Sequence, residues 1–299
     1  MKHLKIFENF KNNLIFESKM VKSIEKICKK YSIENYTISS DGTVDVTGDV
    51  DLANNDFKIL PIKFGKITGD FECDNNKLKT LEGSPTEVGG TFYCQINELV
   101  TLEGSPKKVG DHFICTNNKL VTLQGAPTEV GGSFGCQFNQ LTTLEGAPTE
   151  VGDFFDCGSN NLTTLEGAPK KVGGNFNCRY NKLTTLEGGP NSVGGYFECS
   201  HNQLTTLVGS PKSITGYFEC DNNRLISLEG GPTEMDGYFI CENNPIFQVY
   251  KIFESYKEYL DSLDYNYLRG TDIVKLRFQE ALEEVGKKIP KKIKGYNYI

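Results

Sequence analysis

Nine cysteines recur at an interval of 21 residues along this chain, from Cys73 to Cys241, without an insertion or a deletion. Around each of them the chain repeats the pattern x-F-x-C-x-x-N-x-L-x-x-L-E-G-x-P-x-x-V-G-G. A unit this short cannot bury its apolar side chains alone, so such units stack on their neighbours. The period therefore predicts a solenoid of about ten coils.

The apolar positions of the repeat indicate how each coil packs. Phe and Cys stand two residues apart, so both point to the same side of a short strand. Two Leu positions and one Val position complete a set of five inward side chains. This is the pattern of a leucine-rich repeat. We therefore expect an α/β repeat fold: a leucine-rich-repeat solenoid with parallel β-strands on the concave face and helical N- and C-terminal caps.

The regular cysteines have two interpretations. A free Cys packs as a small hydrophobic residue, which predicts a column of buried thiols inside the coils. The alternative is redox or metal chemistry, but the chain has no C-x-x-C pair and no Cys/His cluster. Equivalent side chains on parallel strands also lack the directions that a disulfide needs. We predict free, buried thiols, with no metal and no cofactor.

An asparagine follows every repeat cysteine by three residues. Its amide has two N–H donors and one acceptor oxygen, so it can satisfy backbone groups of its own coil and of the next one. This ladder predicts a structural role, not a catalytic one. Its members are Asn76, Asn97, Asn118, Asn139, Asn160, Asn181, Asn202, Asn223 and Asn244.

The two ends of the chain depart from the repeat. We divide it into a helical N-terminal segment (1–41), the solenoid (42–245) and a helical C-terminal cap (246–299). Residues 42–69 form an atypical first coil without a cysteine, which begins near Val50 and follows a stretch of alternating Val and Asp residues. That stretch predicts a capping hairpin, although a calcium-binding loop is an alternative.

Helical spacing marks both ends. Near the start, Met20, Ile24, Ile27, Cys28 and Tyr31 follow Ser18, a candidate N-cap. Near the end, the chain shows one apolar stripe from Ile246 to Leu263. A second helix is then expected between Thr271, as its N-cap, and Gly286, with an inward face made of Val274, Phe278, Leu282 and Val285.

Charge and hydropathy exclude two classes of partner. The net charge is −7, and residues 42–244 carry fourteen basic and twenty-six acidic residues, a net charge of −12. Such a surface repels phosphate backbones, so we expect no nucleic-acid binding by the repeats. No segment approaches the about 20 apolar residues of a membrane helix, and the start does not read as a secretory signal. We expect a cytoplasmic protein, and the sequence does not define its oligomeric state.

The repeat resembles the short leucine-rich repeats of secreted bacterial effectors, with one residue inserted before the strand. The chain also resembles leucine-rich-repeat proteins encoded by tailed bacteriophages. This second resemblance rests on the lead-in "YTISSDGTVDVTGDVDL", on repeats of the form "NxLTTLEGAPxxVGGxFxC", and on the ending "LDSLDYNYLRGT…IKGYNYI". It implies a phage-encoded protein of the bacterial host cytoplasm.

The phage resemblance also suggests a virion-associated alternative. The tripeptide "IFE" at Ile6–Glu8 and at Ile15–Glu17 resembles the sites cut by phage head-maturation proteases. Under that interpretation residues 1–17 are a removable packaging tag of an internal head protein.

No catalytic motif stands out, and a regular repeat does not favour a unique catalytic site, so we expect a non-enzymatic protein. A solenoid instead binds partners along its concave face. There, the outward positions three before, one before, one after and two after each cysteine vary and are rich in aromatic residues. We predict partner binding by Phe138, Phe154, Arg179, Tyr180, Tyr196, Glu198, His201, Tyr217, Glu219 and Tyr238.

The expected partner is a protein, such as a host or defence protein. Aromatic residues and Arg are common anchors of protein interfaces. A structural alternative is that the aromatic residues only stabilise neighbouring strands. Functional alternatives are a virion component and a protein that sequesters a small ligand.

Overall fold

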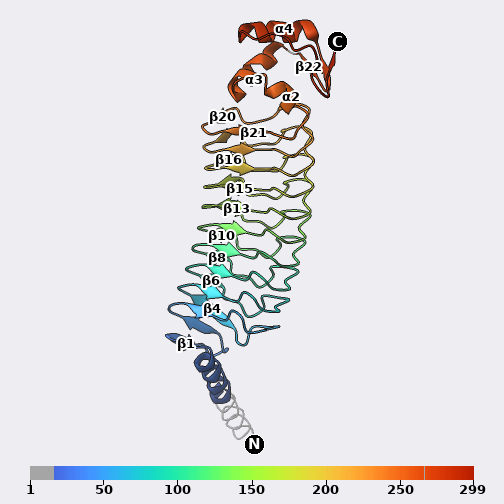
Figure 1. The fold of residues 1–299 in the computed structure, drawn as a ribbon. Coiled ribbons are helices and arrows are strands. Elements are labelled where there is room, and N and C mark those ends of the chain that lie inside the picture. Colours follow the sequence, from blue (N-terminus) through green and yellow to red (C-terminus); the bar gives the residue numbers. More distant parts are fainter. Residues whose placement is uncertain (1–16, 266) are drawn as a thin grey trace, which may run out of the picture. The chain divides into compact units, whose positions relative to one another are not determined.

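The computed structural model describes residues 17–265 and 267–299. The chain divides into two compact units, Met1–Phe155 (unit 1) and Asp156–Ile299 (unit 2). Figure 1 labels the helices and strands of both. The tripeptide Ile6–Glu8 lies outside the described residues, and so does Ile15–Glu17 except for Glu17. The predicted division at residues 41 and 245 remains a proposal.

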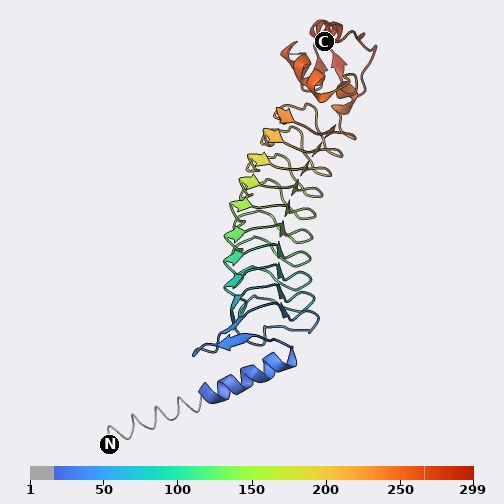
Figure 2. The same ribbon diagram turned by 90° about the vertical axis from the view of Figure 1, so that its left-hand side faces the viewer.

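Each full repeat forms one coil with two short strands. In the coil that contains Cys115, these are β8 (Lys108–Val109) and β9 (Phe113–Ile114). Equivalent residues of neighbouring coils pair in parallel, as Phe92 does with Phe113 and Val88 with Val109. Figure 2 shows the strands of successive coils lying one above another within each unit. This arrangement confirms the predicted parallel leucine-rich-repeat solenoid, while the second strand, which contains the repeat Val, was not expected.

Unit 1 holds two series of parallel strands behind one antiparallel hairpin. The hairpin is β1 (Tyr36–Ile38) with β2 (Val44–Val46). The first series continues from β2 through β4 (Phe64–Ile67), β6 (Glu87–Val88), β8, β10 (Glu129–Val130) and β12 (Glu150–Val151). The second comprises β3 (Val50–Asp51), β5 (Phe71–Glu72), β7 (Phe92–Tyr93), β9 and β11 (Phe134–Gly135). Strand β13 (Phe155–Asp156) contains the boundary between the units.

Unit 2 repeats this architecture and ends in a small α/β cap. Its first series is β14 (Lys171–Val172), β16 (Ser192–Val193), β18 (Ser213–Ile214) and β20 (Glu234–Met235). Its second series is β15 (Phe176–Asn177), β17 (Phe197–Glu198), β19 (Phe218–Glu219) and β21 (Phe239–Ile240). The cap contains α2 (Phe247–Tyr250), α3 (Tyr256–Ser262), the 3-10 helix η1 (Leu263–Tyr265), β22 (Leu268–Arg269), β23 (Asp272–Ile273), α4 (Lys275–Glu284) and β24 (Asn297–Tyr298).

The core consists of the five side chains that the sequence placed inside each coil. In the coil of Cys115, the residues Val109, Phe113, Cys115, Leu120 and Leu123 are all buried. Burying one such Leu, Val or Phe side chain contributes about 1.5–3 kcal/mol. The Phe rings of successive coils stack, with centroids 5.5 Å apart between Phe71 and Phe92. A coil therefore completes its core only through its neighbours.

All ten cysteines are free and buried, as predicted for the nine of the repeat. Burial raises the pKa of each thiol for which a shift is resolved, and brings the pKa of Cys241 to about 12. The thiolate is the reactive form, so these cysteines are expected to react slowly in the folded protein. The weak S–H donor of Cys115 points to the carbonyl oxygen of Gly135 at 3.3 Å.

The burial of the ten cysteines predicts how fast a thiol reagent modifies them. A maleimide reagent should modify the native protein slowly and all ten cysteines completely after denaturation, because unfolding removes both the shielding and the raised pKa. Mass spectrometry of the labelled protein gives the count. Fast modification of several thiols without denaturant, or a mass that shows disulfides, would contradict the packing of the core.

The asparagine ladder connects neighbouring coils, as Asn118 shows. Its Nδ2 donates to the carbonyl oxygens of Cys115 at 3.1 Å and Cys94 at 3.0 Å. Its Oδ1 accepts a hydrogen bond from the backbone N–H of Leu99 at 3.0 Å. The predicted role within its own coil is confirmed, but the neighbour that the Asn serves is the preceding coil and not the next one. Leaving such buried groups unpaired costs about 1–3 kcal/mol.

Steric constraints explain the presence of glycine at two positions of the repeat. Gly104, in the L-E-G segment, adopts a φ of +90°, in the left-handed region that favours glycine. Gly110, in the V-G segment, lies so close to the preceding coil that a Cβ atom there would collide with the carbonyl oxygen of Gly89. The first constraint applies in every coil from Gly83 to Gly230, whereas the Gly110 position is replaced by Thr215 and Asp236 in the last two coils.

The N-terminal part of unit 1 largely follows the prediction. Residues 17–30 are helical, and the predicted stripe buries Ile24 and Cys28. The expected N-cap was wrong, because Ser18 lies within the helical residues. A hairpin is present, but it joins Tyr36–Ile38, which precedes the alternating stretch, to Val44–Val46 within it. Val50 pairs with Phe71, so the first coil begins where expected.

The C-terminal cap differs from the prediction of two helices. The stripe from Ile246 to Leu263 is broken into α2 and α3, and Ser255 caps α3 by accepting a hydrogen bond from the N–H of Glu258. Thr271 is not a helix cap: it precedes β23, and α4 has Val274 at its N-cap position. Strand β23 pairs with β22 and β24 to form a three-stranded sheet that the sequence did not reveal.

Candidate functional site

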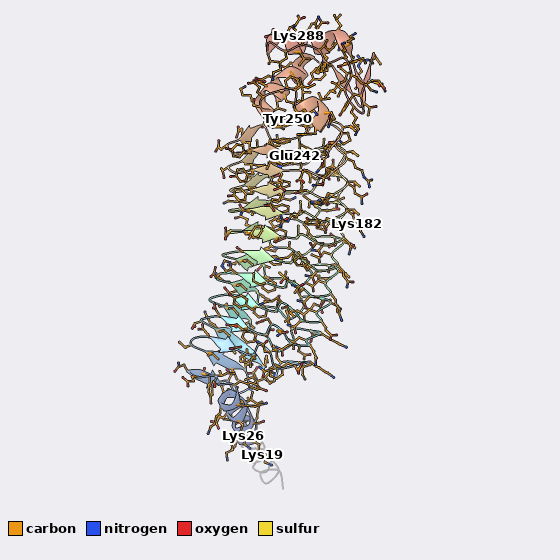
Figure 3. All side chains as sticks on the ribbon, viewed as in Figure 1. Lys19, Lys26, Lys182, Glu242, Tyr250 and Lys288 are labelled. Atoms are coloured by element: carbon orange, nitrogen blue, oxygen red, sulfur yellow. The ribbon has the colours of Figure 1, made fainter. Side chains whose placement is uncertain are left out.

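Outward side chains of the second strand series in unit 2 form one continuous surface, which we term the ladder face. It consists of the positions three before, one before, one after and two after Cys178, Cys199, Cys220 and Cys241. Side chains alternate across a strand, so the first three positions point away from the buried Phe and Cys. The position two after the cysteine follows the strand, at a bend where φ is positive. Figure 3 labels Glu242 on this face, and Lys182 among the loops away from the strands.

One border of the ladder face is a row of three tyrosines, Tyr196, Tyr217 and Tyr238, termed the tyrosine row. The ring centroids of Tyr196 and Tyr217 are 4.8 Å apart, and those of Tyr217 and Tyr238 are 5.5 Å apart. The backbone fixes this spacing, because each Tyr carbonyl accepts a ladder hydrogen bond, as Tyr217 does from Phe197 at 2.9 Å. The side chains are 40%, 39% and 73% exposed. The row therefore presents aromatic surface to solvent.

The opposite border carries Tyr180 and His201, termed the edge pair. Their rings stack with centroids 4.3 Å apart and an interplanar angle of 11°. Tyr180 is 51% exposed, and its ring lies 6.0 Å from the guanidinium carbon of Arg179. The edge pair thus adds a second aromatic surface at the end of the strands.

The edge pair occupies a strained backbone position. The residue two after each repeat cysteine has a positive φ, for example 55° at Tyr180 and 56° at His201. Asn tolerates this left-handed conformation, whereas bulky and β-branched residues do so at a cost. Asn occupies the position at Asn75, Asn117, Asn222 and Asn243, but other coils carry larger residues. Those are Ile96, Phe138, Ser159, Tyr180 and His201.

This strain predicts that two exposed residues of unit 1 reduce stability. We expect Ile96→Asn and Phe138→Asn each to raise the free energy of unfolding by about 1 kcal/mol, because Asn relieves the left-handed strain. The midpoint of urea unfolding measures the effect. Asn117→Ala is the matched control in the opposite direction and should lower the midpoint. If Ile96→Asn does not stabilise the protein, these residues carry no backbone cost.

Charged side chains fill the area between the two borders. Arg179 pairs with Glu198, with Nη1 and Oε2 3.6 Å apart. Ser200 donates a hydrogen bond to Glu219 at 3.1 Å. Burial raises the pKa of Glu219, and the neighbouring carboxylates of Asp221 and Glu198 raise it further, while the Ser200 hydrogen bond lowers it. The centre of the ladder face is therefore a zone of mutually repelling acids.

Eight of the ten predicted site residues lie on the ladder face. Phe138 and Phe154 belong to unit 1, where Phe138 is exposed and Phe154 is half-buried. The ladder face brings together the other members in three groups: the tyrosine row, the edge pair, and the charged Arg179, Glu198 and Glu219.

The residues predicted to bind a partner did not include some exposed residues at the same outward positions of the repeat. Ile96 is half exposed in a strained conformation, and Ile240 and Glu242 lie on the ladder face beside Tyr238. Ile96 could have been found, because it stands in a column where Asn is the commonest residue.

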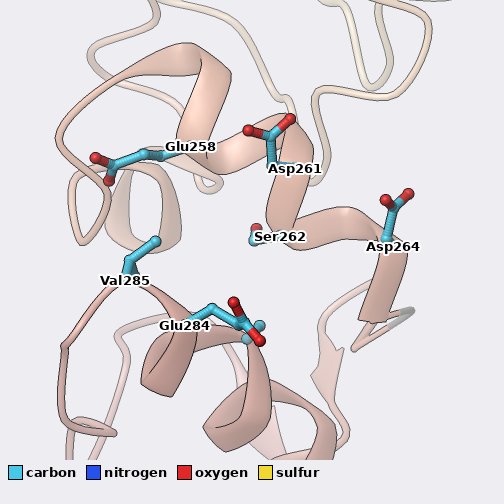
Figure 4. Close-up of a pocket in the computed structure, with 7 residues that line it drawn as sticks. Glu258, Asp261, Ser262, Asp264, Glu284 and Val285 are labelled. Atoms are coloured by element: carbon cyan, nitrogen blue, oxygen red, sulfur yellow. The ribbon is translucent and has the colours of Figure 1, made fainter.

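The cap of unit 2 contains a separate pocket of about 400 Å³. Its lining includes Glu258, Asp261, Asp264 and Glu284, and Figure 4 shows these acidic side chains around the opening. Among the residues that the structure describes, no group of three or more His, Cys, Asp or Glu side chains is placed to hold a metal ion. No helix within the described ranges is long and apolar enough to span a membrane.

Comparisons with known proteins complete the description. No protein-family model matches the chain, and no curated protein matches it. A solved structure with similarity is YopM from Yersinia enterocolitica WA-314, with 16% sequence identity and a TM-score of 0.32. The match covers 66% of this chain and spans 56% of the YopM chain.

Proposed function

We propose that this protein is a non-enzymatic binding module that holds a protein partner on the ladder face of unit 2. The observation that carries the proposal is the exposure of stacked aromatic rings in the tyrosine row and the edge pair. Large aromatic side chains supply much of the binding energy of protein interfaces, and they lose little conformational entropy when bound.

The fold does not require these aromatic residues. The tyrosine-row position is Asp70, Thr91 and Ser133 in coils of unit 1, and those coils form the same pair of strands. Polar residues there even assist the ladder, since Asp70 accepts a hydrogen bond from the N–H of Thr91 at 2.7 Å. Tyrosine at this position therefore adds exposed surface that the repeat architecture does not need.

The backbone conformation of the edge pair also indicates that its exposed rings serve binding. Tyr180 occupies a left-handed position that suits Asn or His better, and its ring stacks on that of His201 at the same position of the next coil. Strain of this kind persists where it serves a function, and an exposed Tyr–His stack at an interface is such a function.

The finer part of the proposal concerns origin and target. The resemblance of the lead-in, repeats and ending to tailed-phage leucine-rich-repeat proteins supports a phage-encoded protein that acts in the host cytoplasm. A host or defence protein is then the target. The test must separate this role from that of a virion component.

The experiment is affinity capture from phage-infected bacteria, followed by mass spectrometry. The baits are the unmodified protein, the triple variant Tyr196→Ala/Tyr217→Ala/Tyr238→Ala, and the double variant Glu166→Ala/Glu187→Ala in the loops away from the strands. We expect one protein that the first and third baits retain and the triple variant loses. Equal recovery with all folded baits would contradict the proposal, and recovery of the protein with purified phage particles would favour the virion role.

A further inference from the structure

The aromatic borders of the ladder face enclose an excess of negative charge. In unit 2, the positions one before and one after the cysteines of the coils that contain β15, β17, β19 and β21 carry a single basic side chain, Arg179. The acidic side chains at these positions are Glu198, Glu219, Asp221 and Glu242. The negative charge and the aromatic rings of the ladder face therefore lie on the same coils.

The protein's own cations do not neutralise this charge. Arg179 pairs with Glu198 only at 3.6 Å, and the described residues show no ion pair to Glu219, Asp221 or Glu242. Asn222 donates to Asp221 and Ser200 to Glu219, but these neutral donors leave the net charge in place. The raised pKa of Glu219, with burial first and neighbouring acids next among its causes, reflects the same repulsion.

We propose that the partner docks through a basic, Arg-containing extended segment that lies on the ladder face of unit 2. This inference rests on the proposed function and names the chemistry of its partner. A guanidinium group pairs with carboxylates and also stacks on aromatic faces, so it suits a face on which Glu219 stands two residues after Tyr217, on the same side of the chain. Binding relieves the repulsion among the acids, which makes charge complementarity the basis of partner choice.

The geometry of the face suits an extended chain. Successive coils place equivalent side chains about 4.8 Å apart, so the tyrosine row and the acids form parallel tracks across neighbouring strands. A segment that crosses the strands meets a Tyr ring and a carboxylate in each coil from Cys199 to Cys241. The carboxylate stands before the cysteine at Glu198 and Glu219 and after it at Glu242. A Tyr and a carboxylate in each of three neighbouring coils favour a segment with several Arg residues over a single cation.

The test measures binding of a fluorescent peptide of alternating Arg and Ser residues by anisotropy at low salt. The first variant is Glu219→Gln/Glu242→Gln on the ladder face. The matched control is Glu166→Gln/Glu187→Gln, which removes the same two charges from exposed loop positions of the same unit. We expect the face variant to weaken binding about tenfold or more and the control to change it less than twofold, with the face effect reduced at high salt.

Two results would overturn the inference. Equal weakening by the two double variants would mean attraction by net charge alone, and an unchanged affinity of the face variant would mean that the acids do not contact the peptide. The tyrosine triple variant separates this failure from that of the proposed function. If that variant loses the protein captured from cells while the acidic residues have no effect on binding, the ladder face binds a partner of different chemistry.

Discussion

Deletion of residues 246–299 is expected to make the protein aggregate or lose coils from its C-terminal end. The cap covers the last coil, where Phe239 and Cys241 are buried. The ring of Tyr256 stacks on Phe239 with centroids 3.9 Å apart, and the Tyr296 hydroxyl donates to the carbonyl oxygen of Ile226 at 2.9 Å. Because each repeat depends on its neighbour, an uncovered last coil loses the contacts that hold it.

A single substitution tests the same interface more gently. Tyr256→Ala should lower the free energy of unfolding by about 3 kcal/mol, because it removes a large buried ring and leaves a cavity over Phe239. Thermal melting measures the loss of stability, and size-exclusion chromatography measures the aggregation of the truncated protein. A truncated protein that stays monomeric with an unchanged melting temperature would show that residues 246–299 form an independent domain.

The second large effect is expected in binding. Tyr196→Ala, Tyr217→Ala and Tyr238→Ala should each weaken the affinity for the partner about thirtyfold, near 2 kcal/mol, as for anchor residues of protein interfaces. Each ring pair lost should cost the fold only about 0.5–1.5 kcal/mol, and Tyr217→Ala removes two such pairs. Affinity measured by titration, together with a urea melt of each variant, separates the two contributions. Loss of stability without loss of affinity would mean that the tyrosines only support neighbouring strands.

The repeat made the interior predictable. Nine copies of one pattern identified Phe, Cys, two Leu and Val as the inward side chains, and the structure confirms all five in the coil of Cys115. The second strand was missed, although its Val stands four residues before each Phe. Only the pairing of neighbouring coils, as between Val88 and Val109, turns that segment into a strand.

The cap was less predictable because no repeat guides its interpretation. The stripe from Ile246 to Leu263 has helical spacing, but α2 ends at Tyr250 and the chain starts α3 only after the cap at Ser255. The pairing of Asp272 with Asn297 joins residues far apart in sequence, and no local pattern indicates it.

The sequence identified which repeat positions form the candidate site, but not which of their side chains contact one another. Variation at the outward positions identified Tyr196, Tyr217 and Tyr238. The sequence did not indicate that Tyr180 and His201 stack, nor that both adopt a positive φ. That conformation depends on the bend after each strand, and the Asn residues in the same column were its only visible sign.

Titration of the captured partner against paired surface variants tests the binding account most directly. The ladder-face variant is Tyr196→Ala/Tyr217→Ala/Tyr238→Ala, and the comparison variants are Lys170→Ala/Lys171→Ala and Lys291→Ala/Lys292→Ala, the latter in the C-terminal cap. We expect the first to abolish measurable binding while its melt remains cooperative, and the others to bind within about twofold of the unmodified protein. Normal binding by the tyrosine variant, with binding lost on change of either lysine pair, would contradict the account and place the site outside the ladder face.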